Sequence, residues 1–251
     1  MQTRLLRSPL PARGFSLVEM MVALAVLGLA VAGTVIFTYQ ALNTYYYESG
    51  RLLLNHDMRK FTNDMTTDAV YSNYFEIYPD FATRSKTTAG VTTDAWLPNN
   101  QSGDFLLLVF ASTNPSSGVT TVNRLIGYYR DTPDPTDPTK SIPTNSGSVR
   151  RFDVAISPAV VIGSPTNAGA TPPVYTMYDL LNKYAPTGTT STTIAVQTAT
   201  GFLTDPATGT ICRIFYNYRN SSVMVNGQFT ENGNLIRKAA NTYNFTVSPR
   251  G

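Results

Sequence analysis

Apolar residues form one long uninterrupted run near the start of the chain. From Phe15 to Phe37 the one strongly polar side chain is that of Glu19. A helix rises ~1.5 Å per residue, so this run is roughly 35 Å long, enough to cross a hydrocarbon core of ~30 Å. The pattern therefore predicts a membrane-spanning helix over residues 15–37.

The helical pattern continues beyond the membrane segment. No proline occurs between Pro11 and Pro79, and apolar residues recur at spacings of three and four. We predict one helix over residues 15–70, about 50 to 55 residues long, whose second half is amphipathic. The apolar stripe consists of Tyr47, Gly50, Leu54, Met58, Phe61, Met65 and Ala69.

Charged residues in the same stretch are spaced as on a solvated helix face. The pairs are Glu48 with Arg51, Asp57 with Lys60, and Lys60 with Asp64. The lone His56 lies among them, so we expect a solvated or capping histidine, not a metal ligand. Tyr39, Tyr45, Tyr46 and Tyr47 follow the apolar run, where the aromatic belt of a membrane interface belongs. A sugar-binding or stacking role is the alternative for these tyrosines.

After Tyr71 the pattern changes to short β-type segments over residues 71–251. Phe105–Phe110 and Val122–Arg130 are expected to pair across the turn Asn114–Gly118. Asn226-Gly227 and Asn232-Gly233 are hairpin-turn signals, and Met177–Tyr184 is a candidate short helix. The other predicted strands are Val149–Ile156, Ile194–Gln197, Ile211–Arg219, Val223–Phe229, Leu235–Ala240 and Tyr243–Ser248.

Charge gives no support for a general affinity for nucleic acid. The net charge is +3, with 19 basic and 16 acidic residues, and the three arginines before Gly14 account for the whole excess. After Gly14 the chain is balanced, so no global basic field is expected. Arg4, Arg7 and Arg13 also predict that the N-terminus stays in the cytoplasm and that everything after Phe37 is extracytoplasmic.

The sequence offers little for catalysis, cofactors or metals. It has one His and one Cys, no Gly-rich phosphate loop and no nucleophile motif, so we expect no enzyme and no cofactor. The single Cys212 cannot form an intramolecular disulfide, and we interpret it as a small buried apolar residue, the alternatives being an intermolecular bridge or a reactive thiol. Asp131–Pro138 contains three aspartates, but its prolines favour a solvated loop over a calcium site. Gly163–Pro173 is a second turn-rich loop.

The segment Arg13–Glu19, read Arg-Gly-Phe-Ser-Leu-Val-Glu, resembles the processing segment of type IV prepilins and pseudopilins. The resemblance implies cleavage between Gly14 and Phe15 by a prepilin peptidase, methylation of the new N-terminal Phe15, and removal of residues 1–14 as a leader. Glycine suits such a site because it lets the backbone approach a protease closely. A generic signal anchor is the alternative, and an ordinary signal peptidase would cut after the apolar run.

Glu19 is the residue that a simple anchor does not need, because a carboxylate inside a membrane is costly and is usually functional. Its place in the first turns of a helix lowers that cost, since the macrodipole favours an acid there. The resemblance implies that Glu19 pairs with the N-terminal amine of a neighbouring subunit and so sets the register of assembly. Glu19 is therefore the predicted subunit-assembly residue.

The expected fold class is α+β and pilin-like, with the long N-terminal helix packed on a β-rich antiparallel extracytoplasmic head. The resemblance is closest to minor pilins and to the J-type minor pseudopilins of type II secretion. Beyond the helix it rests on Asp104–Val109, Tyr128–Arg130 and Val149–Phe152. A large head and the lack of a cysteine pair favour a low-copy subunit at the tip of a filament.

The resemblance also implies a location and a set of partners. The chain would span the inner membrane once, with its head in the periplasm, before entering a filament. Its partners would be the prepilin peptidase, other pilin or pseudopilin subunits, the inner-membrane assembly platform with its ATPase, and membrane lipid.

A membrane-anchored binding module, acting as an adhesin or a DNA-uptake component, is the alternative function. Exposed aromatic and basic residues on Tyr128–Arg130 and Arg150–Phe152 would suit a binder for single strands. Strands with one solvated face give the same pattern, and we favour that interpretation. The sequence does not identify a DNA or sugar site.

Overall fold

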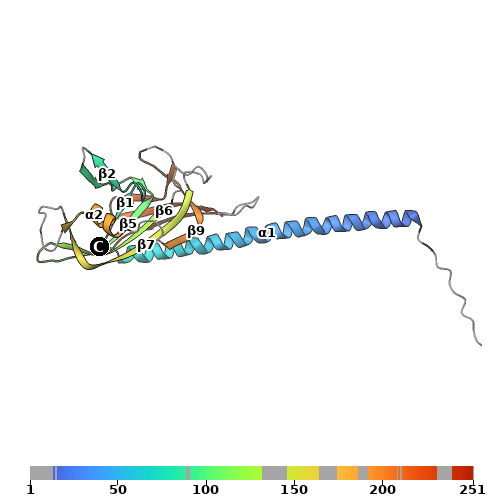
Figure 1. The fold of residues 1–251 in the computed structure, drawn as a ribbon, viewed down its shortest axis with the longest axis horizontal. Helices are drawn as coiled ribbons and strands as arrows, with labels where there is room; N and C mark the ends of the chain where they lie inside the picture. The colour runs from blue at the N-terminus through green and yellow to red at the C-terminus, as the bar shows by residue number, and fades with distance from the viewer. Residues whose placement is uncertain are drawn as a thin grey trace, which may run out of the picture. The chain divides into compact units, whose positions relative to one another are not determined.

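The computed structural model describes residues 14, 16–88, 91–131, 146–163, 174–185, 192–207, 209, 211–230 and 239–250. The chain divides into two compact units, Met1–Tyr46 and Tyr47–Gly251. The helices are α1 (Leu17–Tyr71) and α2 (Met177–Tyr184) (Figure 1). The strands are β1 (Tyr74–Tyr78), β2 (Ser85–Thr88), β3 (Val91–Asp94), β4 (Ser102–Gly103), β5 (Phe105–Thr113), β6 (Thr120–Asp131), β7 (Ser146–Ile162), β8 (Val174–Tyr175), β9 (Thr192–Gly201), β10 (Leu203–Thr204), β11 (Ile211–Arg213), β12 (Phe215–Tyr218), β13 (Ser222–Thr230) and β14 (Ala240–Val247).

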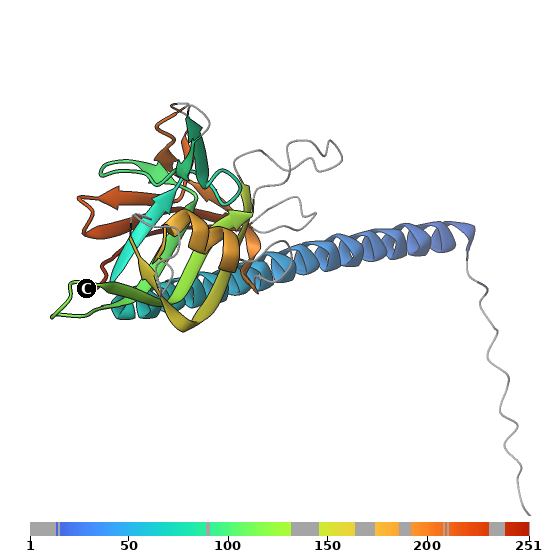
Figure 2. The ribbon, with the colours of Figure 1, turned by 60° about the vertical axis from the view of Figure 1, so that its left-hand side comes forward.

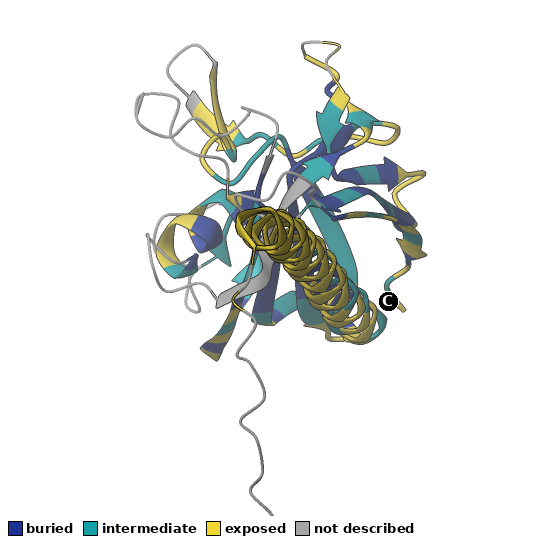
Figure 3. Cartoon of the chain, turned by 90° about the vertical axis from the view of Figure 1, so that its right-hand side faces the viewer, coloured by how far each residue is buried: buried dark blue, intermediate teal, exposed yellow. Residues whose placement is uncertain are grey.

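Helix α1 is continuous over 55 residues and belongs to both units. In the first unit its apolar side chains are exposed: the large ones from Leu17 to Phe37 are each between 54% and 75% accessible. In the second unit one face is buried, through Gly50, Leu54, Phe61, Met65 and Ala69. Figure 3 shows the first part of the helix in the colour of exposed residues. The change from all-round exposure to a buried stripe is the amphipathic pattern that the sequence predicts.

The second part of α1 packs on one face of a large antiparallel sheet with the order β1-β5-β6-β7-β9-β13-β12-β4. Strand β14 pairs with β13, and β8 pairs in parallel with β7. Strands β5 and β6 pair across the predicted turn, with Phe105 opposite Tyr129 and Leu108 opposite Ile126. The architecture is α+β and pilin-like, as the sequence predicts (Figure 2).

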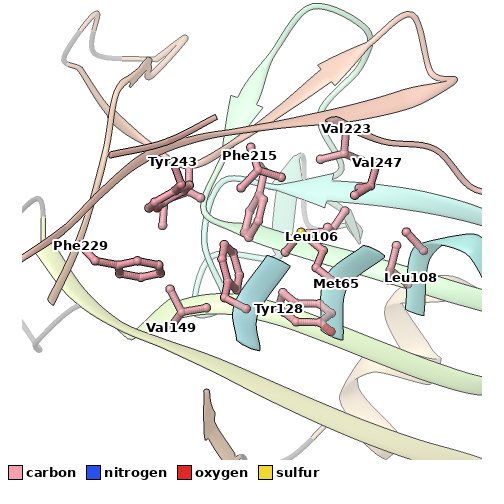
Figure 4. Close-up of a cluster of buried hydrophobic side chains, with 14 of the residues drawn as sticks. Met65, Leu106, Leu108, Tyr128, Val149, Phe215, Val223, Phe229, Tyr243 and Val247 are labelled. Atoms are coloured by element: carbon pink, nitrogen blue, oxygen red, sulfur yellow. The ribbon is translucent and has the colours of Figure 1, made fainter. Parts of the chain in front are cut away.

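Two apolar clusters cover the two faces of the central strands. One contains the buried face of α1 together with residues of β5, β6, β12, β13 and β14, and Figure 4 shows a part of it with ten side chains labelled. The other packs α2, through Met177, Leu180 and Leu181, against alternate residues of the same strands β5 and β6. Strand β5 is therefore buried on both faces, which explains its unbroken apolar sequence.

Phe61 lies at the centre of the contact between α1 and the sheet. Its ring makes edge contacts with those of Tyr128 on β6, Phe229 on β13, and Tyr243 and Phe245 on β14, with centroid separations of 5.7 to 6.3 Å. Such pairs contribute about 0.5 to 1.5 kcal/mol each beyond the area that they bury. One helical residue thus connects three strands.

The short helix α2 begins at a capping box. The Thr176 hydroxyl accepts a hydrogen bond from the Asp179 N–H, and the Asp179 carboxylate accepts one from the Thr176 N–H. The helix covers Met177–Tyr184, as predicted. Its apolar side then lies on the sheet, where Leu180 and Leu181 are buried.

Several expectations from the sequence are wrong. Asp57 is buried, not solvated, because it lies three residues after Leu54 and four before Phe61, on the core face of α1. Asn226-Gly227 is not a turn: both residues lie inside β13, opposite Asn244 and Tyr243 of β14. Cys212 is only partly buried.

Five further predicted features differ from the structure or lie outside its described part. The predicted strand Ile211–Arg219 is two strands, because the Ile214 N–H donates to the Asp104 carboxylate and leaves the ladder. Loop residues 132–138 and 164–173, and the turn Asn232-Gly233, lie outside the described residues. So does most of the predicted strand 235–240.

Candidate membrane and assembly segment

Helix α1 begins with a capping box that contains the predicted assembly residue. The Ser16 N–H donates to Oε2 of Glu19 at 2.9 Å, and the Glu19 N–H donates to the Ser16 hydroxyl oxygen at 3.2 Å. The Met20 N–H donates to the Ser16 carbonyl, which starts the helical ladder. Glu19 thus satisfies one of the backbone donors that a helix start leaves without a partner.

The sequence contains the signal for this box, Ser16 followed three residues later by Glu19, and sequence reasoning missed it. Ser16 is therefore an additional candidate residue of the segment. Gly14 is exposed, with no other atom within 4 Å of the position where a Cβ would lie. Phe15 lies outside the described residues, so its cleavage and methylation stay predictions.

The first part of α1 has the properties of a membrane-spanning helix. It contains an 18-residue stretch apolar enough to cross a membrane, and none of that stretch is buried inside the structure. The hydroxyls of Thr34 and Thr38 donate to the carbonyls of Val31 and Thr34, each at 2.8 Å. These polar side chains are satisfied within the helix, as a lipid environment requires.

The aromatic and basic residues of β6 and β7 do not form an exposed binding surface. Tyr128, Tyr129, Arg130 and Phe152 are all buried, each at most 5% accessible. The expected solvated face is absent from this part of β6, because α1 covers one side and α2 with its neighbours covers the other. Arg150 and Arg151, which belong to the same predicted pattern, are half-buried and pair with acidic residues, so a single-strand site on this pattern is not supported.

A buried ion-pair cluster joins β6 to the segments around β4 and β11; it consists of Asp104, Arg130, Asp205 and Arg213. Arg130 pairs with Asp104, while the Arg213 guanidinium donates to Asp104 Oδ2 at 3.1 Å and to Asp205 Oδ2 at 2.8 Å. Burial raises the pKa of Asp104, and the two arginines act against this rise. Removing one partner of such a cluster usually costs about 3 to 5 kcal/mol.

The same cluster lies between β1 and β4, the first and last strands in the order of the sheet. The Asp104 N–H donates to the Pro79 carbonyl just after β1 at 2.9 Å, and Arg213 donates to the same carbonyl at 2.6 Å. A Cβ on Gly103 of β4 would collide with the Tyr78 carbonyl. Glycine at this position lets β4 approach β1 closely.

A second polar cluster joins α1 to the sheet; it consists of Asp68, Arg124, Tyr128, Arg151 and Asp153. Asp68 on α1 accepts from the Tyr128 hydroxyl and from Arg151 Nε. Arg124 makes a bidentate contact with Asp153, with N···O distances of 2.8 and 2.6 Å, which lowers the pKa of that carboxyl. A bidentate contact fixes the relative orientation of the two side chains and also strengthens their interaction. The cluster fixes the last turns of α1 on β6 and β7.

In the part of the chain that the structure describes, neither cluster has the arrangement of a metal site. Among the described residues, no group of three or more His, Cys, Asp and Glu side chains has an arrangement that would hold a metal ion. Lys60, expected to pair with Asp57 or Asp64, makes no ion pair within the described part of the chain. His56 is solvated, with a side chain that is 73% accessible.

Comparison with known proteins gives one match. Residues 11–35 match the family model of the prokaryotic N-terminal methylation motif. No curated protein and no solved structure matches the chain. The match covers about a tenth of the chain, and it supports a precursor of the type IV prepilin kind that a prepilin peptidase processes and that assembles with other pilins.

Proposed function

We propose that this chain is a minor, tip-type subunit of a type IV pilus or of a type II secretion pseudopilus. It is made as a precursor, cut between Gly14 and Phe15, and methylated on Phe15. The observation that carries the proposal is the methylation motif over residues 11–35, which leads directly into an exposed apolar helix. A segment that is cut before its apolar helix keeps that helix as an anchor.

This processing assigns a role to each part of the chain. Residues 1–14 are the leader, residues 15–70 form the helix whose part 15–37 spans the inner membrane, and residues 71–251 form the periplasmic head. Catalysis and the energy for assembly come from the peptidase, the assembly platform and its ATPase. This chain supplies a membrane anchor and a packed head, and it has a structural role.

The proposed role of Glu19 is to bind the N-terminal amine of a neighbouring subunit. Its carboxylate has two oxygens, and Oε2 accepts from the Ser16 N–H while also marking the helix start. An ammonium group next to this carboxylate would meet an acceptor that is already oriented by the capping box. Charge-assisted hydrogen bonds of this kind are about twice as strong as neutral ones.

The proposed tip position rests on the size of the head and on the lack of a cysteine pair. The head carries a sheet of ten strands together with two smaller sheets. Such a domain suits the end of a filament better than a closely packed helical array. The sequence holds a single cysteine, so the disulfide that closes many major pilins cannot form within this chain.

The test is the intact mass of the chain purified from native membranes, with its N-terminal peptide sequenced. We expect a mature chain that begins at a methylated Phe15. The control is the same preparation from cells that lack the prepilin peptidase, in which the chain should still begin at Met1. A chain that begins near Met1 in cells with an active peptidase would contradict the proposal.

A further inference from the structure

Two segments of the head that are hydrogen-bonded to each other carry exposed aromatic rings and several side-chain amides. The residues are Trp96, Asn99, Asn100, Tyr218, Arg219 and Asn220, which we call the amide surface. Trp96 is 51% accessible and Tyr218 is 46% accessible, although both are large apolar rings. The segments 96–101 and 215–222 contain no Lys, Asp or Glu. Neither burial in a core nor solvation by charge accounts for this composition.

The two segments are held together by a network across about 120 residues of sequence. The Asn100 N–H donates to the Asn217 carbonyl at 2.8 Å, and the Asn217 N–H donates to the Gln101 carbonyl at 2.9 Å. The side-chain amide of Asn217 donates to the Leu97 carbonyl, one residue after Trp96, at 3.2 Å. Trp96 and Tyr218 therefore flank the same hydrogen-bonded junction.

The backbone at this junction forms tight turns. Asn100, Arg219 and Asn220 have φ values of 66°, 55° and 54°, and they are all the non-glycine residues with positive φ in the part of the chain that the structure describes. Arg219 and Asn220 are the central residues of the turn between β12 and β13, which the Ser221 N–H closes by donating to the Tyr218 carbonyl at 3.1 Å. A hairpin turn of this kind requires positive φ at both central positions, so the turn fixes the backbone of Arg219 and Asn220.

The hydrogen bonds inside the network determine which donor and acceptor groups remain for a ligand. Asn99 Oδ1 accepts from the Arg219 N–H at 2.5 Å, and Asn220 Oδ1 accepts from the Asn217 amide at 2.8 Å. Each of these side chains thus uses its oxygen internally and keeps its NH₂ group, which is a donor only. With the Arg219 guanidinium, which lies 5.4 Å from the centre of the Tyr218 ring, the surface offers donors around aromatic rings.

We infer that the amide surface binds a carbohydrate. A pyranose ring has an apolar face of C–H groups that stacks on an aromatic ring, and its hydroxyl and ring oxygens accept hydrogen bonds. Trp96 and Tyr218 would supply the stacking contacts, and Asn99, Asn220 and Arg219 would supply the donors. A preformed, rigid surface loses little entropy on binding, which suits a weakly bound ligand of this kind. The inference does not depend on filament assembly.

Trp96 makes the test direct, because it is the one tryptophan of the chain. The full chain, held in a detergent without a sugar headgroup, is titrated with linear oligosaccharides of glucose, of galactose and of N-acetylglucosamine while Trp96 emission is recorded. We expect a saturable change in emission with at least one of them. Tyr218→Ala and Arg219→Ala should each weaken the affinity about tenfold, since each removes a stacking or donor contact.

The matched control is Tyr71→Ala, which removes a ring that is 73% accessible at the end of α1 and should leave the affinity unchanged. Thermal melting of each variant shows that its fold is retained. Absence of an emission change with all three sugars, or an affinity that Tyr218→Ala and Arg219→Ala leave intact, would overturn the inference. A change in emission on adding another filament subunit, with none on adding sugar, would make the surface a protein interface and would also overturn it.

Discussion

Glu19 has two separable properties, a hydrogen-bond acceptor and a negative charge. The acceptor closes the capping box with Ser16, and the charge is what a neighbouring amine would bind. A capping residue is worth about 1 kcal/mol to a helix start, whereas a charged partner in an apolar environment is worth more. Glutamine keeps an acceptor oxygen and removes the charge, so it separates the two properties.

We therefore predict that Glu19→Gln and Glu19→Ala both prevent incorporation into filaments, because both lack the charge. Ser16→Ala weakens the cap and keeps the charge, so it should still assemble. The measurement is the amount of mature chain in sheared filaments relative to that left in the membrane. Normal incorporation of Glu19→Gln would show that capping, not pairing with an amine, is the role of this residue.

Burial on β1 raises the pKa of one acidic residue, Glu76. Its Oε2 accepts from the Tyr78 hydroxyl at 2.6 Å, and burial, with the Asp94 charge nearby, raises its pKa from an ordinary 4.5 to about 7. The folded state therefore binds this proton more tightly than the unfolded chain does. The contribution of Glu76 to stability is present below about pH 4.5 and is lost as the pH rises to about 7.

The predicted consequence is a pH-dependent loss of stability that Glu76→Gln removes. Between pH 4.5 and 7 the ionisation of Glu76 should cost up to about 3 kcal/mol. Denaturation of the two proteins in parallel at pH 5 and pH 8 measures it: the variant should be the more stable at pH 8 and close to the native chain at pH 5. An equal difference at both values of pH would show that Glu76 does not titrate in this range.

At the scale of elements, the sequence predicts best where one local pattern dominates. The stripe from Gly50 to Ala69 and the strands β5 and β6 follow from spacing alone. Asn226-Gly227 fails because its glycine serves another purpose: a Cβ on Gly227 would lie 2.5 Å from the Thr200 carbonyl of β9 and would collide with Tyr243 of β14. A local turn signal cannot reveal that three strands meet at one residue.

The order of the strands and the two polar clusters were beyond sequence reasoning for a related reason. Asp104 and Arg213 are separated by more than a hundred residues, and only their folded neighbourhood makes them partners. The candidate assembly segment, by contrast, is contiguous in sequence. Its motif and its apolar run both lie within residues 11–37, so the sequence alone identifies them, and the capping box of Ser16 and Glu19 is the part that was missed.

The contact between α1 and the sheet is the element-level prediction. Phe61→Ala should lower the free energy of unfolding by about 3 to 5 kcal/mol, since it removes a fully buried ring and four aromatic contacts. Leu52→Ala on the exposed side of the same helix is the control and should change it by less than about 0.5 kcal/mol. The measurement is a denaturant titration of both variants; similar losses for the two would mean that α1 does not pack through Phe61.

At the scale of the whole molecule, the boundary between the compact units does not coincide with the end of the helix. The second unit begins at Tyr47, in the middle of α1, and its core includes Leu54, Phe61, Met65 and Ala69. The strands after Tyr71 therefore lack one wall of their core when they are separated from the helix. This makes residues 47–71 part of the fold of the head, whatever their role in a filament.

Two truncations test this organisation. A chain beginning at Tyr47 should fold and melt cooperatively, because it keeps every helical residue of the apolar cluster and Asp68 with its partners Tyr128 and Arg151. A chain beginning at Ser72 loses these side chains and leaves Arg151 without Asp68, and a loss of several buried groups exceeds the usual stability of a domain. It should be unfolded or aggregated. Circular dichroism during heating compares the two, and a cooperative transition in the shorter chain would show that the strands form a complete core by themselves.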